Sequence, residues 1–104
     1  MRLEREFEKV IRTGRRASDS LLVVYAVENH LEWSRLGISI PKRIGNAVRR
    51  HHVRRRIREA FRRNKNKYRK HVDLVCVARA GAAVKGAPIE SSLVRLIHQA
   101  ASPG

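Results

Sequence analysis

The sequence has little cysteine, few aromatic residues and few acids. Of its 104 residues, one is cysteine, 5% are aromatic and nine are Asp or Glu. The single Cys76 cannot form an intramolecular disulfide, and its place in an apolar run indicates a residue packed in a core strand. One cysteine and scattered histidines also cannot supply the closed tetrahedral ligand set of a structural zinc site. We therefore expect no metal site of this type in the chain.

Long hydrophobic runs are absent as well. No segment of the sequence approaches the ~20 consecutive apolar residues that a membrane-spanning helix needs. The charged segment from Met1 to Glu8 lacks the apolar centre of a signal peptide. We therefore expect a cytoplasmic protein that does not act at a membrane.

Positive charge is abundant. The chain has 24 Lys and Arg, a formal net charge of +15 at pH 7, and 42% hydrophobic residues, which suffice for a core. A chain of this length has room for one compact domain, so we expect a single domain over residues 1–104. A folded domain with this charge imbalance gains from a polyanionic partner, because binding releases counterions condensed on nucleic acid. Nucleic acid is the favoured partner.

The hydrophobic pattern predicts three helices. Leu3, Phe7, Val10 and Ile11 recur at helical spacing, and Gly14 ends this first helix. Residues 47–64 form a long basic helix with one apolar stripe, and Pro88 begins a last helix. The stripe of the long helix consists of Val53, Ile57, Ala60 and Phe61, and that of the last helix of Ile89, Leu93, Leu96, Ile97 and Ala100.

Three apolar segments and one short segment predict strands. Residues 21–27 form a continuous apolar run, so this strand is expected to be covered on both faces. Residues 36–40 alternate between apolar residues and Gly or Ser until Pro41, residues 72–78 are apolar, and residues 15–18 predict a small strand. Residues 81–87 are expected to form a loop. The resulting αβββαβα order predicts an α+β fold in which helices pack on a small mixed sheet.

Basic residues concentrate between residues 42 and 70. On a helical wheel at ~100° per residue, one flank of the long helix carries His51, Arg54, Arg55, Arg58 and Arg62, and the other carries Arg56 and Arg63. Solvated helices usually interleave both signs of charge, whereas Glu59 is the single acid here, so the segment indicates nucleic-acid contact. The fourteen basic positions are 42, 43, 49, 50, 54, 55, 56, 58, 62, 63, 65, 67, 69 and 70.

The start of this helix has two notable residues. Gly45 permits a close approach of the backbone to another surface, and Asn46 is suited to the N-cap position. The backbone amides that follow would then face a phosphate, although a plain strand-to-helix turn explains the same two residues.

The run from Ile38 to Arg62 resembles the signature of the ribonuclease P protein component family. It reads Ile-Ser-Ile-Pro-Lys-Arg-Ile-Gly-Asn-Ala-Val-Arg-Arg-His-His-Val-Arg-Arg-Arg-Ile-Arg-Glu-Ala-Phe-Arg. Three further segments are also similar to the family, namely Glu6 to Ile11 with Gly14, Leu22 to Tyr25, and Asp73 to Arg79, so the resemblance covers nearly the whole chain. One departure is the family's Arg-Asn-Arg triplet, which reads Arg50-His51-His52 here.

The resemblance implies an accessory protein subunit of ribonuclease P, in which RNA and magnesium, bound mainly by that RNA, carry out the cleavage. No catalytic residues are then expected in this chain. The partners implied are the catalytic RNA and precursor tRNA, and the fold implied has a left-handed βαβ crossover. Contacts to the catalytic RNA would come from Asn46, Arg50, His51, His52, Arg54, Arg55 and Arg58. A cleft for the single-stranded 5′ leader would be formed by Phe7, Ile11 and Tyr25, with Lys42 and Arg43 nearby.

Other classes of protein fit the residues less well. A ribosomal or other structured-RNA-binding protein would share the size and charge, and the motif alone argues against it. A helix-turn-helix DNA reader would need paired helices, which an isolated basic helix between strands does not provide. For a protein enzyme, Ser18, Asp19, His30 and the pair His51-His52 are candidates by residue type alone. Adjacent helical residues point ~100° apart, so the two histidines do not form a joint acid-base site.

Overall fold

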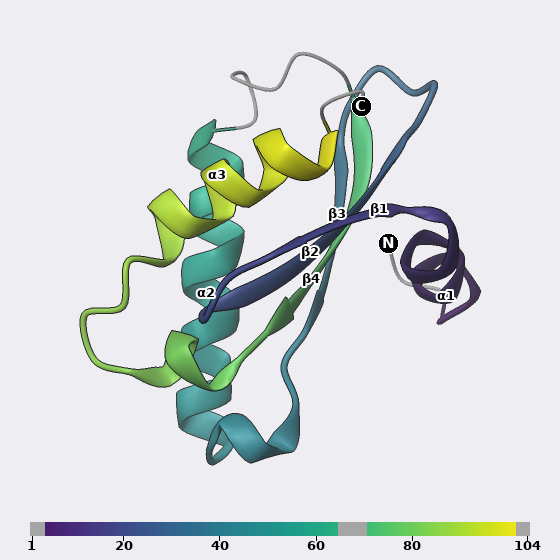
Figure 1. Cartoon of the computed structure of the whole chain (residues 1–104). Helices are drawn as coiled ribbons and strands as arrows, with labels where there is room; N and C mark the ends of the chain where they lie inside the picture. The colour runs from purple at the N-terminus through teal and green to yellow at the C-terminus, as the bar shows by residue number, and fades with distance from the viewer. Residues whose placement is uncertain (1–3, 65–70, 102–104) are drawn as a thin grey trace.

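The computed structural model describes residues 4–64 and 71–101 (Figure 1). Leu3, which the sequence assigned to the first helix, and the basic residues Lys65, Lys67, Arg69 and Lys70 lie outside the described residues. The elements in chain order are α1 (Glu4–Thr13), β1 (Arg15–Ser18), β2 (Leu22–Glu28), β3 (Arg35–Ser39), the 3₁₀ turn η1 (Lys42–Ile44), α2 (Ala47–Asn64), β4 (Val72–Ala78), the 3₁₀ turn η3 (Ala80–Ala83) and α3 (Ile89–Ala101). The predicted α+β order is confirmed.

The four strands form one mixed sheet in the order β1-β2-β4-β3. β1 pairs antiparallel with β2, and β2 pairs antiparallel with β4. β3 pairs parallel with β4, and the connection between these two strands passes through α2. The long basic helix is therefore the crossover of a βαβ unit at one edge of the sheet.

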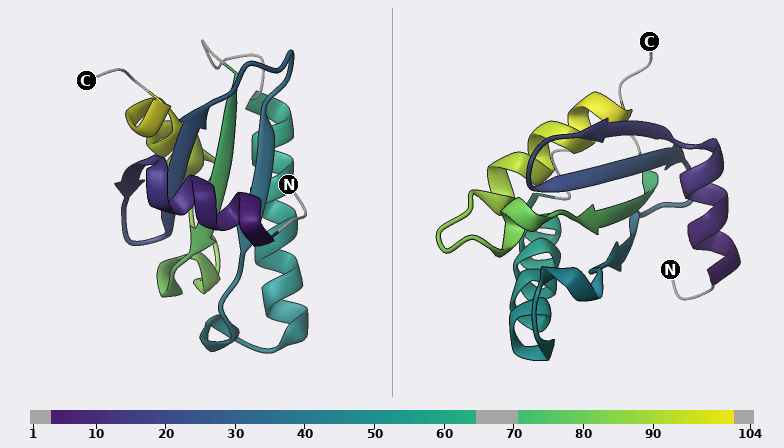
Figure 2. Two further views of the ribbon diagram at one scale, coloured as in Figure 1. Left: turned by 90° about the vertical axis from the view of Figure 1, so that its right-hand side faces the viewer. Right: turned by 60° about the horizontal axis from the view of Figure 1, so that its bottom comes forward.

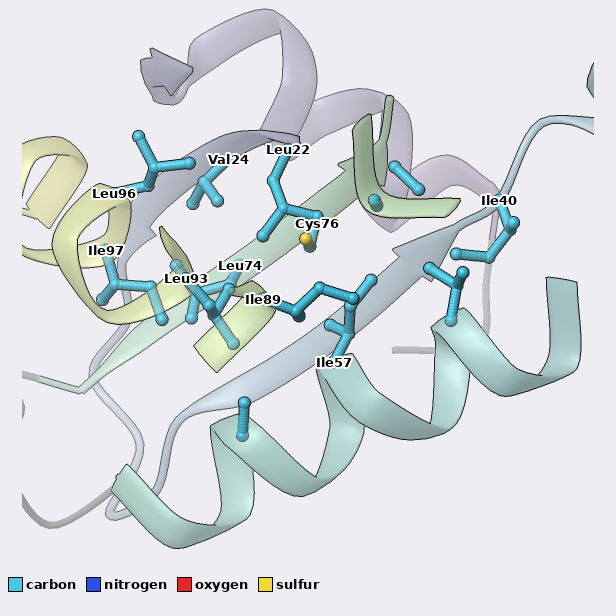
Figure 3. Packing of buried hydrophobic residues seen from close by; sticks show 14 of the residues in the cluster. Leu22, Val24, Ile40, Ile57, Leu74, Cys76, Ile89, Leu93, Leu96 and Ile97 are labelled. Atoms are coloured by element: carbon cyan, nitrogen blue, oxygen red, sulfur yellow. The ribbon is translucent and has the colours of Figure 1, made fainter. Parts of the chain in front are cut away.

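The hydrophobic core lies between one face of the sheet and the helices α2 and α3 (Figure 3). Leu22 and Val24 of β2 and Leu74 and Cys76 of β4 point to this face, and all four are 0% exposed. Cys76 belongs to the core cluster, so the expectation of a core cysteine is confirmed, and its burial raises the pKa of the thiol to about 12. The helices contribute Val53, Ile57 and Ala60 from α2 and Ile89, Leu93, Leu96, Ile97 and Ala100 from α3.

The helix α1 packs on the opposite face of the sheet, where it contacts β2 and β4 (Figures 1 and 2). Val10 of α1 is buried, and the backbone of Gly14 lies against that of Ala26 in β2. A β-carbon on Gly14 would come within 2.4 Å of the Val10 carbonyl oxygen, so glycine is required where α1 ends. The core face of β2 is buried, whereas on the α1 face Val23 is buried and Tyr25 and Val27 are half-buried, so the predicted cover on both faces is complete only on the core side.

Three details differ from the expectations. The segment 81–87 is not a plain loop, because its first half belongs to the 3₁₀ turn η3. The helix α3 begins at Ile89, one residue after Pro88, whose carbonyl oxygen accepts a hydrogen bond from the Ser92 amide at 3.1 Å. The stripe of α2 ends in the buried Asn64, whereas Phe61 is half-buried at the margin of the core. Ala60 and Phe61 point ~100° apart, so only one of them can face the centre of the core.

Candidate nucleic-acid interface

The start of α2 is fixed by the cap that the sequence predicted. The Oδ1 atom of Asn46 accepts a hydrogen bond from the Arg49 amide at 2.9 Å, and its carbonyl oxygen accepts one from the Arg50 amide at 2.9 Å. Gly45 has a φ of +154°, and a β-carbon there would lie 2.7 Å from Cδ of Arg49. The glycine thus allows the aliphatic part of Arg49 to fold back over the turn that precedes the helix.

The two flanks of α2 face different elements. Arg56 donates to the Ala87 carbonyl oxygen at 2.6 Å, and Arg63 pairs with Glu90 at 2.6 Å, so this flank is tied to the α3 side. On the other flank, Arg54 donates to the Ile38 carbonyl oxygen of β3 at 3.3 Å. The positions of Arg54 on one flank and of Arg56 and Arg63 on the other agree with the predicted division.

The side of α2 that faces solvent presents a cationic surface. His51, His52, Arg55 and Arg58 are exposed. Arg55 pairs with Glu59 at 3.2 Å, but the side chain keeps 67% of its surface exposed, so this contact contributes little. Arg50 is half-buried, and its Nε atom is buried without a hydrogen-bond partner among the described residues. The guanidinium groups on this surface are therefore placed to bind phosphates.

A groove of about 420 Å³ runs between α1, β3 and α2. Its walls are formed by Phe7 of α1 and by Arg54, Arg58 and Phe61 of α2, and its floor is the strand segment around Gly37. Two aromatic side chains and two guanidinium groups here come from elements far apart in the sequence. The pattern of the α2 stripe assigned Phe61 to the core, and no local signal in the sequence indicated its place in this groove.

The face of the sheet that bears α1 carries the residues predicted for the cleft. Tyr25 in β2 is half-buried and points away from the core face, because side chains alternate along a strand. Its neighbours across the sheet are Arg16 in β1 and Val75 in β4, and Val75 is in turn opposite Gly37 in β3. Phe7 of α1 lies directly over Gly37.

One flank of α1 is tied to the end of the sheet at which β3 begins. Glu6 lies 3.6 Å from Arg35, which forms two hydrogen bonds with Asp73, at 2.6 and 2.9 Å. Asn29 also donates to Asp73, at 2.7 Å. The Arg35 hydrogen bonds hold the pKa of Asp73 below its ordinary value, with a smaller contribution from Asn29. The Glu6–Arg35 pair thus links α1 to a hydrogen-bonded network at this end of the sheet.

The other flank of α1 faces the rest of this sheet face. Ile11 is 41% exposed and lies ~140° around the helix from Glu6, so it points away from the Arg35 end of β3. Beyond it the sheet carries Val23 and Val77, and β3 ends at Ser39. Lys42 and Arg43 follow Ser39 in the turn η1, and both are exposed. The structure thus places Phe7, Ile11 and Tyr25 on one side of the sheet, with the two cations beyond the end of β3.

Asp19, one of the residues considered for enzyme chemistry, has structural partners instead. Asp19 accepts hydrogen bonds from Ser92 Oγ at 2.5 Å, from Arg95 at 2.6 Å and from the amides of Leu21 and Leu22. It therefore joins the turn before β2 to α3. Within residues 4–64 and 71–101, no three His, Cys, Asp or Glu residues form a group that could hold a metal ion. No helix in that part of the chain is long and apolar enough to cross a membrane.

An arginine-rich helix beside a sheet face with half-buried aromatic and exposed aliphatic side chains defines an RNA-binding protein of α+β fold. A family model described as Ribonuclease P matches residues 1–101. The ribonuclease P protein component of Alkaliphilus metalliredigens is 34% identical over 100 residues, which cover 95% of this chain and 90% of that protein. The protein component of Lachnoclostridium phytofermentans is 40% identical over 92 residues, which cover 88% of this chain and 79% of that protein.

Solved structures agree with these matches. The RNase P protein of Staphylococcus aureus superposes with a TM-score of 0.86 at 30% identity, covering 96% of this chain and 93% of that one. The RNase P protein of Thermotoga maritima also gives a TM-score of 0.86 at 30% identity, covering 100% of this chain and 97% of that one. The superposition on the Thermotoga maritima protein covers the whole of this chain and therefore includes β3, α2 and β4. The crossover through α2 thus has the same hand as in that structure. The family resemblance implies that this hand is left-handed.

The chain belongs to the bacterial ribonuclease P protein component family. It is a protein component of the endoribonuclease holoenzyme that processes the 5′ leader of precursor tRNA.

Proposed function

We propose that this protein binds the catalytic RNA of ribonuclease P through α2 and the 5′ leader of precursor tRNA through the sheet face beside α1. The observation that carries the proposal is that one small fold bears two surfaces of different character, which adjoin at the groove where Phe7 shares the walls with Arg54 and Arg58. One surface is cationic and helical, and the other is an apolar sheet face with aromatic residues and cations at its end. Each surface suits a different form of RNA.

The helix α2 supplies the contacts to the catalytic RNA. Arg50, Arg54, Arg55 and Arg58 offer guanidinium groups to phosphates of the folded RNA, and Asn46, His51 and His52 extend this surface toward the start of the helix. Guanidinium groups bind phosphates in bidentate geometry, which suits the fixed phosphate positions of a structured RNA better than a flexible strand.

The sheet face supplies the contacts to the leader. Unpaired nucleotides present base faces that stack on aromatic side chains without sequence preference. Phe7 and Tyr25 offer two such faces, Ile11 adds an exposed aliphatic side chain, and Lys42 and Arg43 attract the leader phosphates. Ile11 cannot stack as an aromatic residue would, so it contributes apolar contact alone.

In this proposal the chain acts as one domain in the cytoplasm, and it carries no catalytic residue of its own. RNA cleaves the phosphodiester bond with magnesium that is bound mainly by RNA. The protein positions the leader relative to that RNA, and this raises the affinity of the holoenzyme for precursor tRNA over mature tRNA.

The assignment of the leader to the sheet face can be tested with precursor tRNA and mature tRNA, which differ only in the presence of the leader. In holoenzyme assembled at saturating protein, Phe7→Ala and Tyr25→Ala should each weaken precursor tRNA binding by about 1–3 kcal/mol, as for a lost stacking platform. Mature tRNA binding should remain unchanged. Trp33→Ala is the matched control, because Trp33 is 58% exposed but lies in the connection between β2 and β3, at the opposite end of the sheet from Lys42.

A second arm addresses the catalytic RNA. Arg50→Ala should raise the protein concentration needed for assembly and thereby affect both substrates at limiting protein. Equal losses of precursor and mature tRNA affinity in the Phe7 and Tyr25 variants would contradict the leader cleft, and both residues would then act only in packing.

A further inference from the structure

A second groove lies on the flank of α2 that faces away from β3. It has a volume of about 490 Å³ and is lined by residues from the first turns of α2, from the turn η3 and from the segment that follows it. The ribbons of α2 and η3 lie next to each other in Figure 1. We call this second groove the Val48–Val84 groove, after one residue from each wall. Sites for small ligands commonly have volumes of about 300–1,000 Å³. The groove is therefore large enough to hold one nucleotide.

The two valines are unusually exposed. Val48 is 79% exposed and Val84 is 62% exposed, which are the largest values among the large hydrophobic residues of the described chain. Single exposed apolar residues are common on protein surfaces. Here, two of them come from different elements and line the same groove, which indicates an apolar partner rather than chance exposure.

The rest of the groove is polar and positively charged. Arg49, His52 and Lys85 are exposed and line it, and Asp and Glu are absent among the described residues of its lining. Arg49 is held in place because its side chain folds over Gly45, where no β-carbon interferes. A ligand that fits this groove combines an apolar surface with negative charge.

The groove also adjoins the surface proposed for the catalytic RNA. His52 lines the groove, whereas Arg54 and Arg58 line the groove beside β3 on the other flank of α2. An RNA that binds along the exposed side of α2 therefore passes the rim of the Val48–Val84 groove. This continuity favours RNA over an acidic peptide as the occupant.

We propose that the Val48–Val84 groove binds one unpaired nucleotide of the ribonuclease P catalytic RNA. The base lies against the two valines, and the adjoining phosphate is bound by Arg49 and Lys85. This inference rests on the proposed function, because it assumes that α2 faces the catalytic RNA. It adds a contact to a base, which the arginine surface alone does not provide, since phosphate contacts position an RNA without reading its bases.

Site-directed crosslinking tests the occupant directly. Val84→Cys introduces a surface thiol into a chain whose own Cys76 is 0% exposed and has a raised pKa, so a photoactivatable thiol reagent attaches only at position 84. In the assembled holoenzyme, irradiation should link position 84 to a nucleotide that is unpaired in the catalytic RNA. Gln99→Cys, on the exposed side of α3, is the matched control and should give no such product.

Binding measurements separate the base from the phosphate. Val84→Ser should weaken binding to the catalytic RNA about threefold to tenfold, through loss of apolar contact, and leave the salt dependence unchanged. Lys85→Gln should lower the slope of log affinity against log salt by about 1, as for one lost phosphate contact. Val84→Ser at parental affinity would overturn the proposal. So would crosslinks confined to base-paired RNA, to precursor tRNA or to protein.

Variants of Arg54 and Arg58, on the flank of α2 that faces β3, distinguish failure of the groove inference from failure of the proposed function. If Arg54→Ala with Arg58→Ala weakens binding to the catalytic RNA while the Val84 and Lys85 variants keep parental affinity, the groove inference fails and the proposed function stands. If the arginine variants also keep parental affinity, the proposed function fails, and the groove inference fails with it.

Discussion

The Phe7 ring lies so close over Gly37 that a β-carbon at position 37 would come within 2.5 Å of both Cε1 and Cζ of the ring. This contact joins α1 to the edge strand β3 and sets the height of the ring above the sheet. The same ring forms one wall of the groove between α1, β3 and α2. The Phe7 ring, which we assign to leader binding, can therefore hold this position only because residue 37 of β3 has no side chain.

The first prediction follows from this contact. Gly37→Ala should destabilise the protein by about 1–3 kcal/mol, the range for overpacking a well-filled site, because the ring must move. In a Phe7→Ala background the same change should cost much less, since the two residues are in direct contact. Urea unfolding of the four proteins gives the coupling energy. Equal costs in both backgrounds would show that the ring does not depend on Gly37.

The second prediction concerns acid stability. The pKa of Asp73 is lowered in the folded protein, so its ion pair with Arg35 adds stability above the ordinary value of 3.8. That stability is lost as the pH falls through the lowered pKa. Asp73→Asn should therefore reduce the free energy of unfolding at neutral pH and flatten its decline below about pH 4. Thermal unfolding from pH 2 to 7 measures both, with the exposed Glu32→Gln as a control.

The third prediction concerns the arginine surface. Replacing Arg54, Arg55 and Arg58 together by Ala should weaken binding to the catalytic RNA and reduce the salt slope by up to about 3, one for each lost phosphate contact. Arg54 also donates to Ile38, so circular dichroism must show that the fold is retained. A folded triple variant with parental affinity and slope would place the RNA elsewhere.

The fourth prediction concerns the two histidines. His51 and His52 are both exposed, and His52 lines the Val48–Val84 groove. Restoring the residues of the family triplet, His51→Asn with His52→Arg, should preserve or tighten binding to the catalytic RNA, because both replacements donate hydrogen bonds. Filter binding at two salt concentrations measures the effect. A large loss of affinity would mean that this protein uses a contact specific to histidine.

Much of the fold is local in origin and was predictable. The stripe of α2, the cap at Asn46 and the buried strand around Cys76 follow from the spacing of apolar residues and from residue type. The parallel pairing of β3 with β4 is different, because local periodicity does not say which strands are neighbours. That part of the topology was implied by the family resemblance and not by the pattern.

The candidate site was predictable only in part. The cations of α2 stand out in the sequence because they cluster in one segment that has Glu59 as its single acid. The network of Asn29, Arg35 and Asp73 joins residues that are 38 and 44 positions apart, and nothing in the local pattern marks it. The groove that contains Phe61 has the same origin, since its walls meet only after the crossover has packed against the sheet.

The hydrogen bond from Arg54 to the Ile38 carbonyl oxygen also bears on how the edge of the sheet meets other molecules. A sheet of four strands has two open edges, and an open edge can pair with the edge of another molecule. At the β3 edge, the guanidinium of Arg54 occupies the carbonyl oxygen of Ile38, and at the other edge β1 is only four residues long and carries Arg15 and Arg16. Arginine side chains at both edges of the sheet thus oppose pairing with the edge strand of another molecule. Edge-to-edge pairing of the sheets of two copies of this protein is therefore disfavoured.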